Sequence, residues 1–590
     1  MMRRKTSQHL IPINKNNPCE TTYDIYPSFP VEKGSIKIGY ATLAEEISTA
    51  RIVILDGYVG VDWEEVRSSL DSELRTMGLN PSFINVKDFL KPEEKISSLV
   101  EPFLGGADSI FGRKTNLKLV DYFESSEFEN IKINPKANIN IIYGTGASES
   151  GIEGLLVYFD LPKNELQYRM RANEVTNLGL STPKEHKQIY KHFYFVDWPI
   201  LNTEKKKLLP HISIIVDQQR LGKPVWMSGE DLRHGLKKMS QSCFRVRPWF
   251  EPGVWGGQWM KDKFKDLNQD VPNYAWSFEM IVPENGLLFE SDRALLEVSF
   301  DMLMFQEKES ILGKAAKRFG DEFPIRFDFL DTFQGGNLSV QCHPKPDYIK
   351  KEFGENFTQD ETYYILDAAD GAEIYLGFQK DIVPSEFKKA LNHSFETKEK
   401  LEVENYVQKL PAKKHDLFLI PHGTVHCSGV NNLVLEISAT PYIFTFKMYD
   451  WQRLDLDGNP RPLNIERAFD NLNFERQGQI IQDTLICKPT VEAFGKDWQK
   501  VHLPTHPDHF YDVYRYDFKN EVTIDTHNQC HVLMLVEGES IKLSIEGFQN
   551  QFFCYTETFA VPAAVGSYTL VNKGQKLVKV IISFVKDEAC

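Results

Sequence analysis

Gly336–Pro344 reads GNLSVQCHP, and its centre has the pattern of a short β-strand that ends at a proline. Gln341 and His343 are two residues apart, so in a strand both side chains project from the same face. Cys342 lies between them and points to the opposite face, where we expect it to pack. A Gln-x-His pair on its own is usually packing. The pattern therefore predicts a metal site only if further ligands follow along the chain.

Two later segments supply such ligands. Glu361 opens the strand-like segment ETYYILD, and Ile420–His426 reads IPHGTVH. The proline and glycine of the second segment shape a turn that directs His426 inward, whereas His422 within that turn is expected to be a surface or packing residue. Two imidazoles, one carboxylate and one amide oxygen suit Zn²⁺, or else Mn²⁺, Fe²⁺ or Co²⁺, with positions left open for water or substrate. We therefore predict a catalytic metal site with four ligands: Gln341, His343, Glu361 and His426.

The sequence from about residue 241 onward is typical of all-β structure, because short strand patterns alternate with Gly and Pro. Expected strands are Phe327–Leu330, Leu338–Cys342, Thr362–Leu366, Glu373–Phe378, Leu417–Ile420, Leu433–Ile437, Phe444–Tyr449, Val532–Val536 and Leu577–Val585. A helical insert is expected between Pro384 and Leu410, where Phe387, Ala390 and Leu391 share a helix face. The two blocks of strands predict two jelly-roll domains: residues 241–480 with the metal site and residues 481–590.

Residues 21–240 alternate between strand and helix patterns, which predicts a layered α/β domain. Its expected strands are Ile52–Asp56, Ile139–Tyr143, Leu155–Phe159 and Ile212–Val216. Asp62 is placed to cap the N-terminus of a helix, and Glu65 lies at the capping-box position. Gly78 is placed to end the same helix. The residues that share the buried face of this helix are Val66, Leu70 and Leu74.

Glycine loops follow two of these strands, at Gly57–Asp62 and Gly144–Ser148. This region resembles uridine-kinase-like P-loop proteins. No GK[ST] motif is present, so the lysine and hydroxyl that hold phosphate and Mg²⁺ in such loops are missing. We therefore expect a degenerate kinase-like domain for regulation, ligand sensing or dimerisation, with Arg169, Arg171 and Lys191 as solvated charges.

Length and composition limit the class of protein. A single core rarely exceeds about 250–300 residues, so 590 residues should form two or three domains. A net charge of −15 disfavours nucleic acid as the main partner, and no apolar run reaches the length of a membrane span. Eight scattered cysteines without a CxxC pair are typical of a reduced, cytoplasmic protein. Residues 1–20 are basic without an apolar region, so we expect a disordered arm rather than a signal peptide. The sequence does not indicate the oligomeric state.

The metal-ligand segments resemble those of type I phosphomannose isomerases, a family with the cupin fold. Three segments carry the resemblance most specifically: Leu338–Pro344, Glu361–Asp367 and Phe418–His426. Looser matches are Val254–Gly257, Tyr274–Trp276, Leu435–Ile437, Phe446–Asp450 and, in the second cupin, Phe559–Pro562. The resemblance implies zinc as the metal, held by Gln341, His343, Glu361 and His426.

The resemblance also implies an activity, the interconversion of mannose 6-phosphate and fructose 6-phosphate. In that reaction a proton moves between C1 and C2 through a cis-enediol, which requires a Lewis acid and a base. Lys447 takes the position where the family usually has an active-site Arg. Glu436 is expected to be the acid/base or, equally, a carboxylate that orients another group.

Three basic positions depart from the family pattern. Gln359 and Asp328 stand where the family usually has Lys, and Lys447 replaces Arg, which is not an equivalent anion ligand. We therefore expect the phosphate to be bound differently, by Ser339 with Lys345, Arg326 or Lys413. The alternatives are an isomerase for another sugar, a non-catalytic sugar-sensing or regulatory cupin protein, and an oxygenase-type cupin, which the Gln ligand disfavours.

Overall fold

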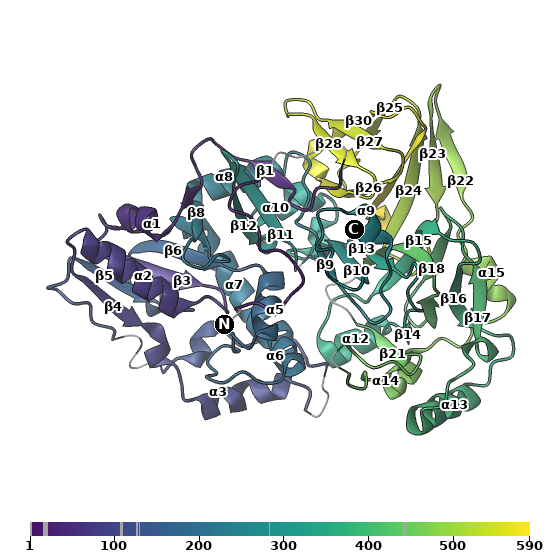
Figure 1. Ribbon diagram of the computed structural model, residues 1–590, viewed down its shortest axis with the longest axis horizontal. Helices are drawn as coiled ribbons and strands as arrows, with labels where there is room; N and C mark the ends of the chain where they lie inside the picture. Colours follow the sequence, from purple (N-terminus) through teal and green to yellow (C-terminus); the bar gives the residue numbers. More distant parts are fainter. Residues whose placement is uncertain are drawn as a thin grey trace. The chain divides into compact units, whose positions relative to one another are not determined.

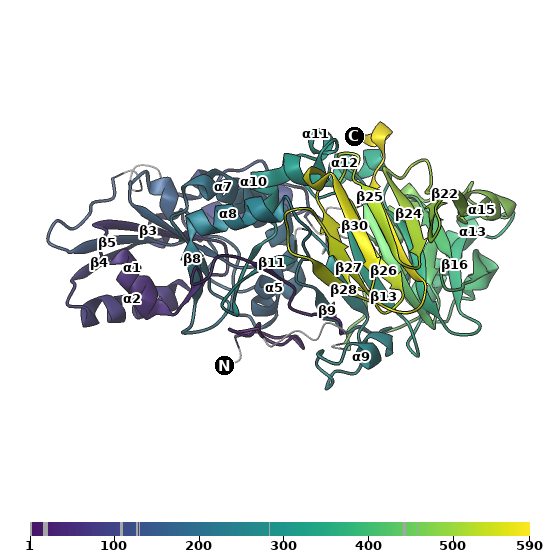
Figure 2. The ribbon, with the colours of Figure 1, turned by 90° about the horizontal axis from the view of Figure 1, so that it is seen from above.

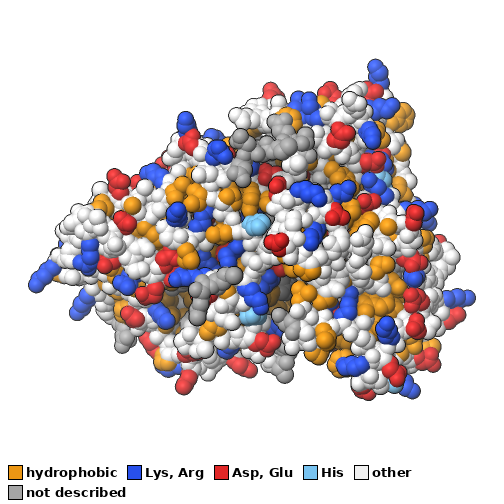
Figure 3. All heavy atoms as spheres, in the orientation of Figure 1, with side chains coloured by type: hydrophobic (Ala, Val, Ile, Leu, Met, Phe, Trp, Pro, Cys, Tyr) orange, Lys and Arg blue, Asp and Glu red, His pale blue; other side chains and the backbone are white. Residues whose placement is uncertain are grey.

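The computed structural model describes residues 3–15, 22–106, 110–124, 128, 130–282, 284–439, 444–456 and 458–590 (Figure 1). The chain forms two compact units. Unit 1 comprises Met1–Asn17, Tyr26–Met239 and Pro283–Glu307, and unit 2 comprises Pro18–Ile25, Ser240–Val282 and Lys308–Cys590. Among the described residues, no helix has both the length and the apolar content that a membrane span needs. On the face seen in Figure 3, acidic and basic side chains are interspersed.

Unit 1 is built on a seven-stranded sheet with the order β2-β8-β7-β6-β3-β5-β4. Its strands are β2 (Lys37–Ile38), β3 (Ile52–Gly57), β4 (Pro81–Asn85), β5 (Ile139–Tyr143), β6 (Leu155–Asp160), β7 (Ile214–Asp217) and β8 (Val225–Ser228). Strands β3 to β7 are parallel, whereas β8 and β2 join antiparallel at one edge. The apolar runs of the sequence become the buried parallel strands, as expected.

Helices cover this sheet. They are α1 (Tyr40–Ile47), α2 (Trp63–Thr76), α3 (Glu93–Val100), α5 (Lys163–Arg171), α6 (His186–His192), α7 (Trp198–Leu208) and α8 (Gly229–Met239). Helices α1 and α2 pack their apolar faces against one side of the sheet, and α7 lies on the other side (Figure 2). This arrangement confirms the expected strand–helix alternation of the N-terminal region.

Helix α2 begins as the sequence predicts. The Asp62 side chain accepts a hydrogen bond from the Glu65 amide at 3.0 Å, and Gly78 follows the helix with a φ of 81°. The buried residues of the helix are Val66, Leu70 and Leu74. The reciprocal half of the capping box is absent among the described contacts, because the Glu65 carboxylate accepts instead from the Tyr40 hydroxyl and the Gly222 amide. The capping prediction is therefore half confirmed.

Two charged side chains that were expected in solvent are buried in unit 1. Arg169 donates to the carbonyl oxygens of Gly60 at 2.9 Å and Gln218 at 2.6 Å, and Lys191 is 6 % exposed. The expectation was wrong for these two because buried loop carbonyls need donors that a sequence pattern does not reveal.

A hairpin from the middle of the chain completes unit 1. The strands β1 (Ser28–Pro30), β11 (Gly286–Ser291) and β12 (Ala294–Ser299) form a three-stranded sheet. The hairpin strands lie inside the range expected for the metal-binding domain, 241–480, yet they cluster with unit 1. Two residues at the end of this hairpin pair with buried lysines: Ser299, the last residue of β12, with Lys205 at 3.0 Å, and Asp301, which follows β12, with Lys163.

The N-terminal arm differs from the disordered segment expected for residues 1–20. Ile11 is 1 % exposed and packs with Leu288 and Leu295, and the Leu295 amide donates to the Ile13 carbonyl at 2.8 Å. The arm is ordered over residues 3–15 because a hairpin distant in sequence offers it an apolar contact and a strand edge. Residues 16–20 lie outside the described residues.

Unit 2 contains a sandwich of two antiparallel sheets, with the orders β18-β15-β20-β13-β10-β9 and β17-β16-β19-β14-β21. The strands are β9 (Trp249–Glu251), β10 (Trp276–Met280), β13 (Arg326–Asp331), β14 (Val340–Cys342), β15 (Asp360–Ala368), β16 (Glu373–Phe378), β17 (Val407–Pro411), β18 (Leu417–Ile420), β19 (His426–Ser428), β20 (Asn432–Ala439) and β21 (Phe446–Tyr449). Every strand expected for this region is present, with ends shifted by a few residues.

Short helices connect these strands. They are α9 (Trp259–Lys263), α10 (Asp301–Leu312), α11 (Ala316–Phe319), α12 (Pro346–Phe353), α13 (Pro384–Thr397), α14 (Ile465–Asn471) and α15 (Gln479–Thr484). Helix α13 is the predicted insert, but it ends before Leu410 because Lys398 adopts a φ of 64° and the chain then enters β17.

The C-terminal part of unit 2 is a second sandwich, with a six-stranded sheet, β22-β23-β24-β31-β26-β29, facing a four-stranded sheet, β25-β30-β27-β28. The strands are β22 (Thr490–Phe494), β23 (Trp498–Leu503), β24 (Tyr511–Phe518), β25 (Glu521–Asp525), β26 (His531–Glu537), β27 (Ser540–Ser544), β28 (Gln551–Cys554), β29 (Thr558–Val561), β30 (Ser567–Asn572) and β31 (Val578–Val585). Residues of both sheets share one apolar core. The all-β character expected here is confirmed, while the boundary at residue 480 stays a prediction.

Candidate metal and substrate site

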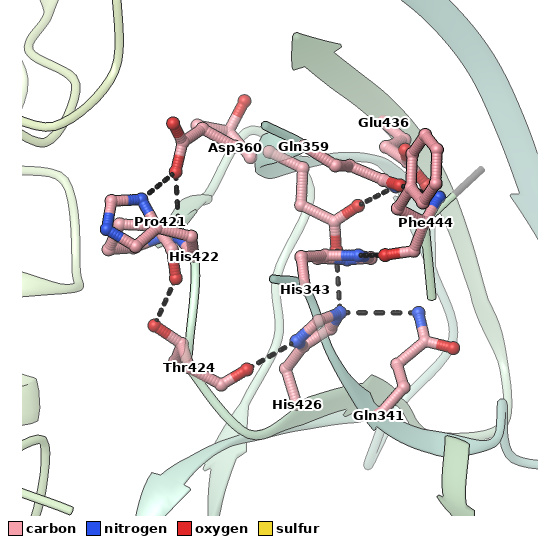
Figure 4. A network of polar contacts seen from close by, with 12 residues as sticks. Gln341, His343, Gln359, Asp360, Pro421, His422, Thr424, His426, Glu436 and Phe444 are labelled. Atoms are coloured by element: carbon pink, nitrogen blue, oxygen red, sulfur yellow. Dashed lines mark hydrogen bonds and ion pairs between the residues drawn. The ribbon is translucent and has the colours of Figure 1, made fainter. Parts of the chain in front are cut away.

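The predicted metal ligands meet between the two sheets of the first sandwich (Figure 4). Gln341 on β14 and His426 on β19 are directly opposed in an antiparallel pair, so their side chains share a face. Glu361 comes from β15 of the facing sheet, and His343 follows β14. Cys342 is fully buried, in agreement with the packing role predicted for it.

The ligand atoms converge on one carboxylate oxygen. Nε2 of His426 lies 2.6 Å and Nε2 of His343 lies 3.2 Å from Oε1 of Glu361. Nε2 of Gln341 lies 3.3 Å from Nε2 of His426. Both imidazoles and the carboxylate are buried, and these three groups are close enough together to hold a metal ion.

Backbone carbonyls fix the tautomer of both imidazoles. Nδ1 of His343 lies 2.9 Å from the Phe444 oxygen, and Nδ1 of His426 lies 2.9 Å from the Thr424 oxygen. A carbonyl only accepts, so each Nδ1 carries a hydrogen and donates it, and each Nε2 is left facing Glu361. Neutral rings in this tautomer would point two lone pairs at a carboxylate oxygen. A divalent cation among these atoms removes that repulsion, so the residues fit a metal ion.

The carboxylate of Glu361 is held ionised and oriented. Burial raises the pKa of the Glu361 carboxyl, but positive charge at His343 and His426 lowers it well below its usual value, and a cation held among these groups would act in the same direction. The amide of Gln359 donates to the other carboxylate oxygen at 3.2 Å and accepts from the Phe444 amide at 3.1 Å. Gln359, where the related family has Lys, therefore orients a metal ligand.

A second group of charges lies beside the ligands. Arg326 donates to both oxygens of Asp328, at 3.0 and 3.2 Å, and its Nη2 is 4.0 Å from Oε1 of Glu436. Burial, together with the charges of Asp328 and Glu361, raises the pKa of Glu436 well above its usual value, against the effect of Arg326. Burial likewise raises the pKa of Asp328 to about 6. Glu436 thus holds a proton more readily than an ordinary carboxyl group does.

The remaining predicted residues lie around this centre at different places. Lys447 is opposite Gln341 in the β14–β21 pair and is partly exposed, so it belongs to the same face as the ligands. The hydroxyl of Ser339 donates to Asp450 at 2.8 Å. Lys345 directly precedes helix α12. Burial raises the pKa of the Cys342 thiol and the charge of Lys345 opposes this rise, so Lys345 acts on a residue that points to the other face of β14. Arg326 and Lys447 thus accompany the ligands more closely than Ser339 and Lys345 do.

Two neighbours of the ligands were not predicted as site residues. The ring of Tyr363 stands edge-on to His426 at 5.7 Å, and its buried hydroxyl has no hydrogen-bond partner among the described residues. Its position two residues after Glu361 was the signal in the sequence. Asp360 accepts from the His422 amide at 2.7 Å and from its Nδ1 at 2.9 Å, which fixes the turn before His426 and gives His422 a structural role.

Different parts of the chain are similar to different known proteins. Residues 39–241 match a family described as a domain of unknown function, DUF8485. The resemblance of this part to P-loop proteins stays a prediction.

Over about half of its length the chain is similar to proteins named as mannose-6-phosphate isomerases. The probable mannose-6-phosphate isomerase GmuF of Bacillus subtilis is 24 % identical over 326 residues, which cover 55 % of this chain and 95 % of that protein. The mannose-6-phosphate isomerase of Streptococcus mutans is 27 % identical over 227 residues, 37 % of this chain and 64 % of that protein.

Solved structures of similar proteins carry related names. The mannose 6-phosphate isomerase of Bacillus subtilis has a TM-score of 0.48 and 21 % identity, and the match covers 58 % of this chain and 99 % of that one. A putative mannosephosphate isomerase of Archaeoglobus fulgidus has a TM-score of 0.44 and 18 % identity, with 59 % and 98 % covered.

Proposed function

We propose that unit 2 is a metal-dependent aldose–ketose isomerase of the cupin class that interconverts mannose 6-phosphate and fructose 6-phosphate. The observation that carries this proposal is the convergence of two imidazole Nε2 atoms on Glu361, with both Nδ1 hydrogens committed to backbone carbonyls. The names of the similar proteins supply the substrate.

The metal in this proposal is Zn²⁺, with Gln341, His343, Glu361 and His426 as its ligands. Gln341 takes part through its amide oxygen, since the oxygen and nitrogen of a carboxamide exchange places by a simple rotation. When bound, the cation acts as a Lewis acid that polarises the sugar oxygens on C1 and C2. Gln359 keeps Glu361 oriented for this role.

Glu436 is the acid/base of the proposed reaction. It accepts the proton from C2 of the aldose and returns it to C1, while a hydroxyl proton moves from O2 to O1, so the cis-enediol intermediate leads to the ketose. A catalytic base works best with a pKa near the operating pH, and the rise in the pKa of Glu436 is in the direction that this condition requires. Arg326 remains beside it as a buried positive charge that favours the enediolate.

Lys447 is the proposed ligand of the phosphate. It shares the face of Gln341 and is partly exposed. The guanidinium of Arg326 is held by Asp328. Ser339 is engaged by Asp450, which also pairs with Arg453 and Arg461. A single lysine is a weaker anion ligand than the family's several basic residues, so a high KM is expected.

The test is isomerisation of mannose 6-phosphate by the full-length protein, with and without chelator and added zinc. His343→Ala is expected to abolish both zinc binding and turnover. Cys342→Ala, next to it in the chain but on the other face of β14, should preserve both, apart from some loss of stability. A zinc-loaded protein without turnover would refute the isomerase and favour the sugar-sensing alternative.

A further inference from the structure

Unit 1 contains a cavity of about 830 Å³ that is lined by segments following five parallel strands, by residues 174–180 and by the arm residues Arg3, Arg4, Leu10, Ile11 and Ile13. The segments after the strands include Val59–Glu64 after β3, Asn85–Lys87 after β4, Gly144–Thr145 after β5 and Gln219–Leu221 after β7, and helix α5 after β6 adds Glu165 and Arg169. Ligands of open α/β sheets bind in the crevice outside the carboxyl ends of the strands. The position and size of this cavity are those of a ligand site.

The cavity lining includes carboxylates that can bind a cation, beside the basic side chains of Lys87, Arg169, Arg220 and Lys223. Asp62 caps helix α2, and Glu64 and Glu65 lie in its first turn, where a phosphate site would require free backbone N–H groups and positive charge. The side chain of Glu165, also on the lining, is only 2 % exposed, and Nε of Arg169 lies 3.8 Å from its carboxylate, beyond hydrogen-bond length. A buried carboxylate needs a charged hydrogen-bonding partner.

The arm of the chain provides such cations. The guanidinium of Arg4 donates from Nε to both oxygens of Glu165 at 3.1 Å and from Nη2 at 2.9 Å, and it lies 5.1 Å from the ring centre of Tyr168. Arg3 forms an ion pair with Asp62 and lies 3.7 Å from Glu65. The two successive arginines therefore bind two separate carboxylate clusters at the cavity.

The arm has an anchor and a tip with different physical character. The anchor, residues 11–15, is held by the buried side chain of Ile11 and by backbone hydrogen bonds to β12 and to Arg293. The tip, residues 3–5, is held mainly by ion pairs and by one backbone hydrogen bond, from Lys5 to the Tyr168 oxygen at 2.9 Å. The side chain of Arg3 is 43 % exposed, so salt and competing cations reach the tip more easily than the anchor.

We propose that the carboxylates on the wall of this cavity form a binding site for paired guanidinium groups and that residues 3–5 are its tethered occupant, a strap that covers these carboxylates until it is displaced. A tethered ligand acts at an effective concentration of about 1 mM or more. A free peptide with two successive arginines should therefore compete poorly with the strap and bind well once the arginines of the strap are removed. The proposal is independent of the function proposed for unit 2.

The test measures binding of a fluorescent synthetic peptide with the sequence of residues 3–10, RRKTSQHL, to the full-length protein by anisotropy. The Arg3→Ala/Arg4→Ala protein is expected to bind this peptide at least about tenfold more tightly than the wild type does. Adding Glu165→Gln should weaken binding at least about tenfold, whereas Glu174→Gln, on the same cavity lining, should leave it unchanged. A peptide with both arginines replaced by alanine should not bind.

Equal affinity of the wild type and the double variant would overturn the proposal, as would equal affinity for the two peptides. Hydrogen exchange of the wild-type chain gives a second measurement that needs no substitution. In about 0.5 M salt, the Lys5 amide should lose protection while the Leu295 amide, which donates to the anchor, keeps it. Unchanged exchange at Lys5, or loss of protection at both amides together, would contradict a releasable strap.

Discussion

Gln359→Leu removes the polar contacts of a residue beside the proposed metal centre. The substitution keeps the approximate size of the side chain but removes two hydrogen bonds, the one of 3.2 Å to Oε2 of Glu361 and the one of 3.1 Å from the Phe444 amide. A hydrogen bond to a charged group contributes about 1.5–3 kcal/mol, and each 1.4 kcal/mol corresponds to about a tenfold change in affinity. The Kd for zinc should therefore rise about 10- to 100-fold, the range that loss of an outer ligand contact usually causes.

The assay is competition for zinc between the protein and a chelating dye. Thr362→Val is the matched control, because Thr362 follows Glu361 in the chain but bonds to the Ile437 oxygen instead. An unchanged Kd in Gln359→Leu would refute the role of Gln359 in orienting the ligand. An equal loss of affinity in the control would show that any disturbance of β15 weakens the site.

The remaining predictions concern catalysis, substrate affinity and stability. Glu436→Gln should lower kcat about 10²- to 10⁴-fold without loss of bound zinc; wild-type turnover in this variant would exclude Glu436 as the acid/base. Lys447→Ala should raise the KM for mannose 6-phosphate about tenfold with kcat less affected, and Lys447→Arg should restore it; identical KM values would place the phosphate elsewhere. Burial raises the pKa of Glu279 from 4.5 to about 7, so the carboxyl destabilises the folded state progressively as the pH rises through this range. Between pH 4.5 and pH 7, the free energy of unfolding of Glu279→Gln should rise relative to that of the wild type by up to about 3 kcal/mol. If the unfolding transitions of unit 2 in the variant and in the wild type differ by the same amount at every pH, this prediction is contradicted.

The metal centre could be predicted from the sequence because its geometry is local. Gln341 and His343 share a face through strand alternation alone, and Pro421 and Gly423 mark the turn that directs His426. Once these three side chains point inward, a single further strand, the one that carries Glu361, completes the ligand set.

The charge cluster beside the centre could not be predicted in the same way. Its members come together through the register of β13, β20 and β15, in which Asp328 and Tyr363 are both paired with Glu436. Sequence reasoning identified Asp328 only as a departure from the related family. The pairing of Arg326 with Asp328 is local, since the two residues share a face of β13, but their position beside Glu436 depends on the register of β13 and β20, which no local pattern encodes. The ordered arm was missed for a similar reason, since its partner hairpin begins more than 250 residues later.

The pairing of Lys163 with Asp301, just after β12, has a consequence for the order of synthesis. The Lys163 ammonium is almost completely buried, and Asp301 lies some sixty residues beyond the last helix of the α/β sheet, whereas Lys205 already pairs with Asp160 of β6 at 2.8 Å. A ribosome adds about 5–20 residues per second, so in the nascent sheet the Lys163 ammonium must wait several seconds for this carboxylate. A fragment that ends near residue 240 should behave as a permanently arrested nascent chain, soluble only if chaperones shield it. The α/β unit is thus completed late in translation, although most of it is made first.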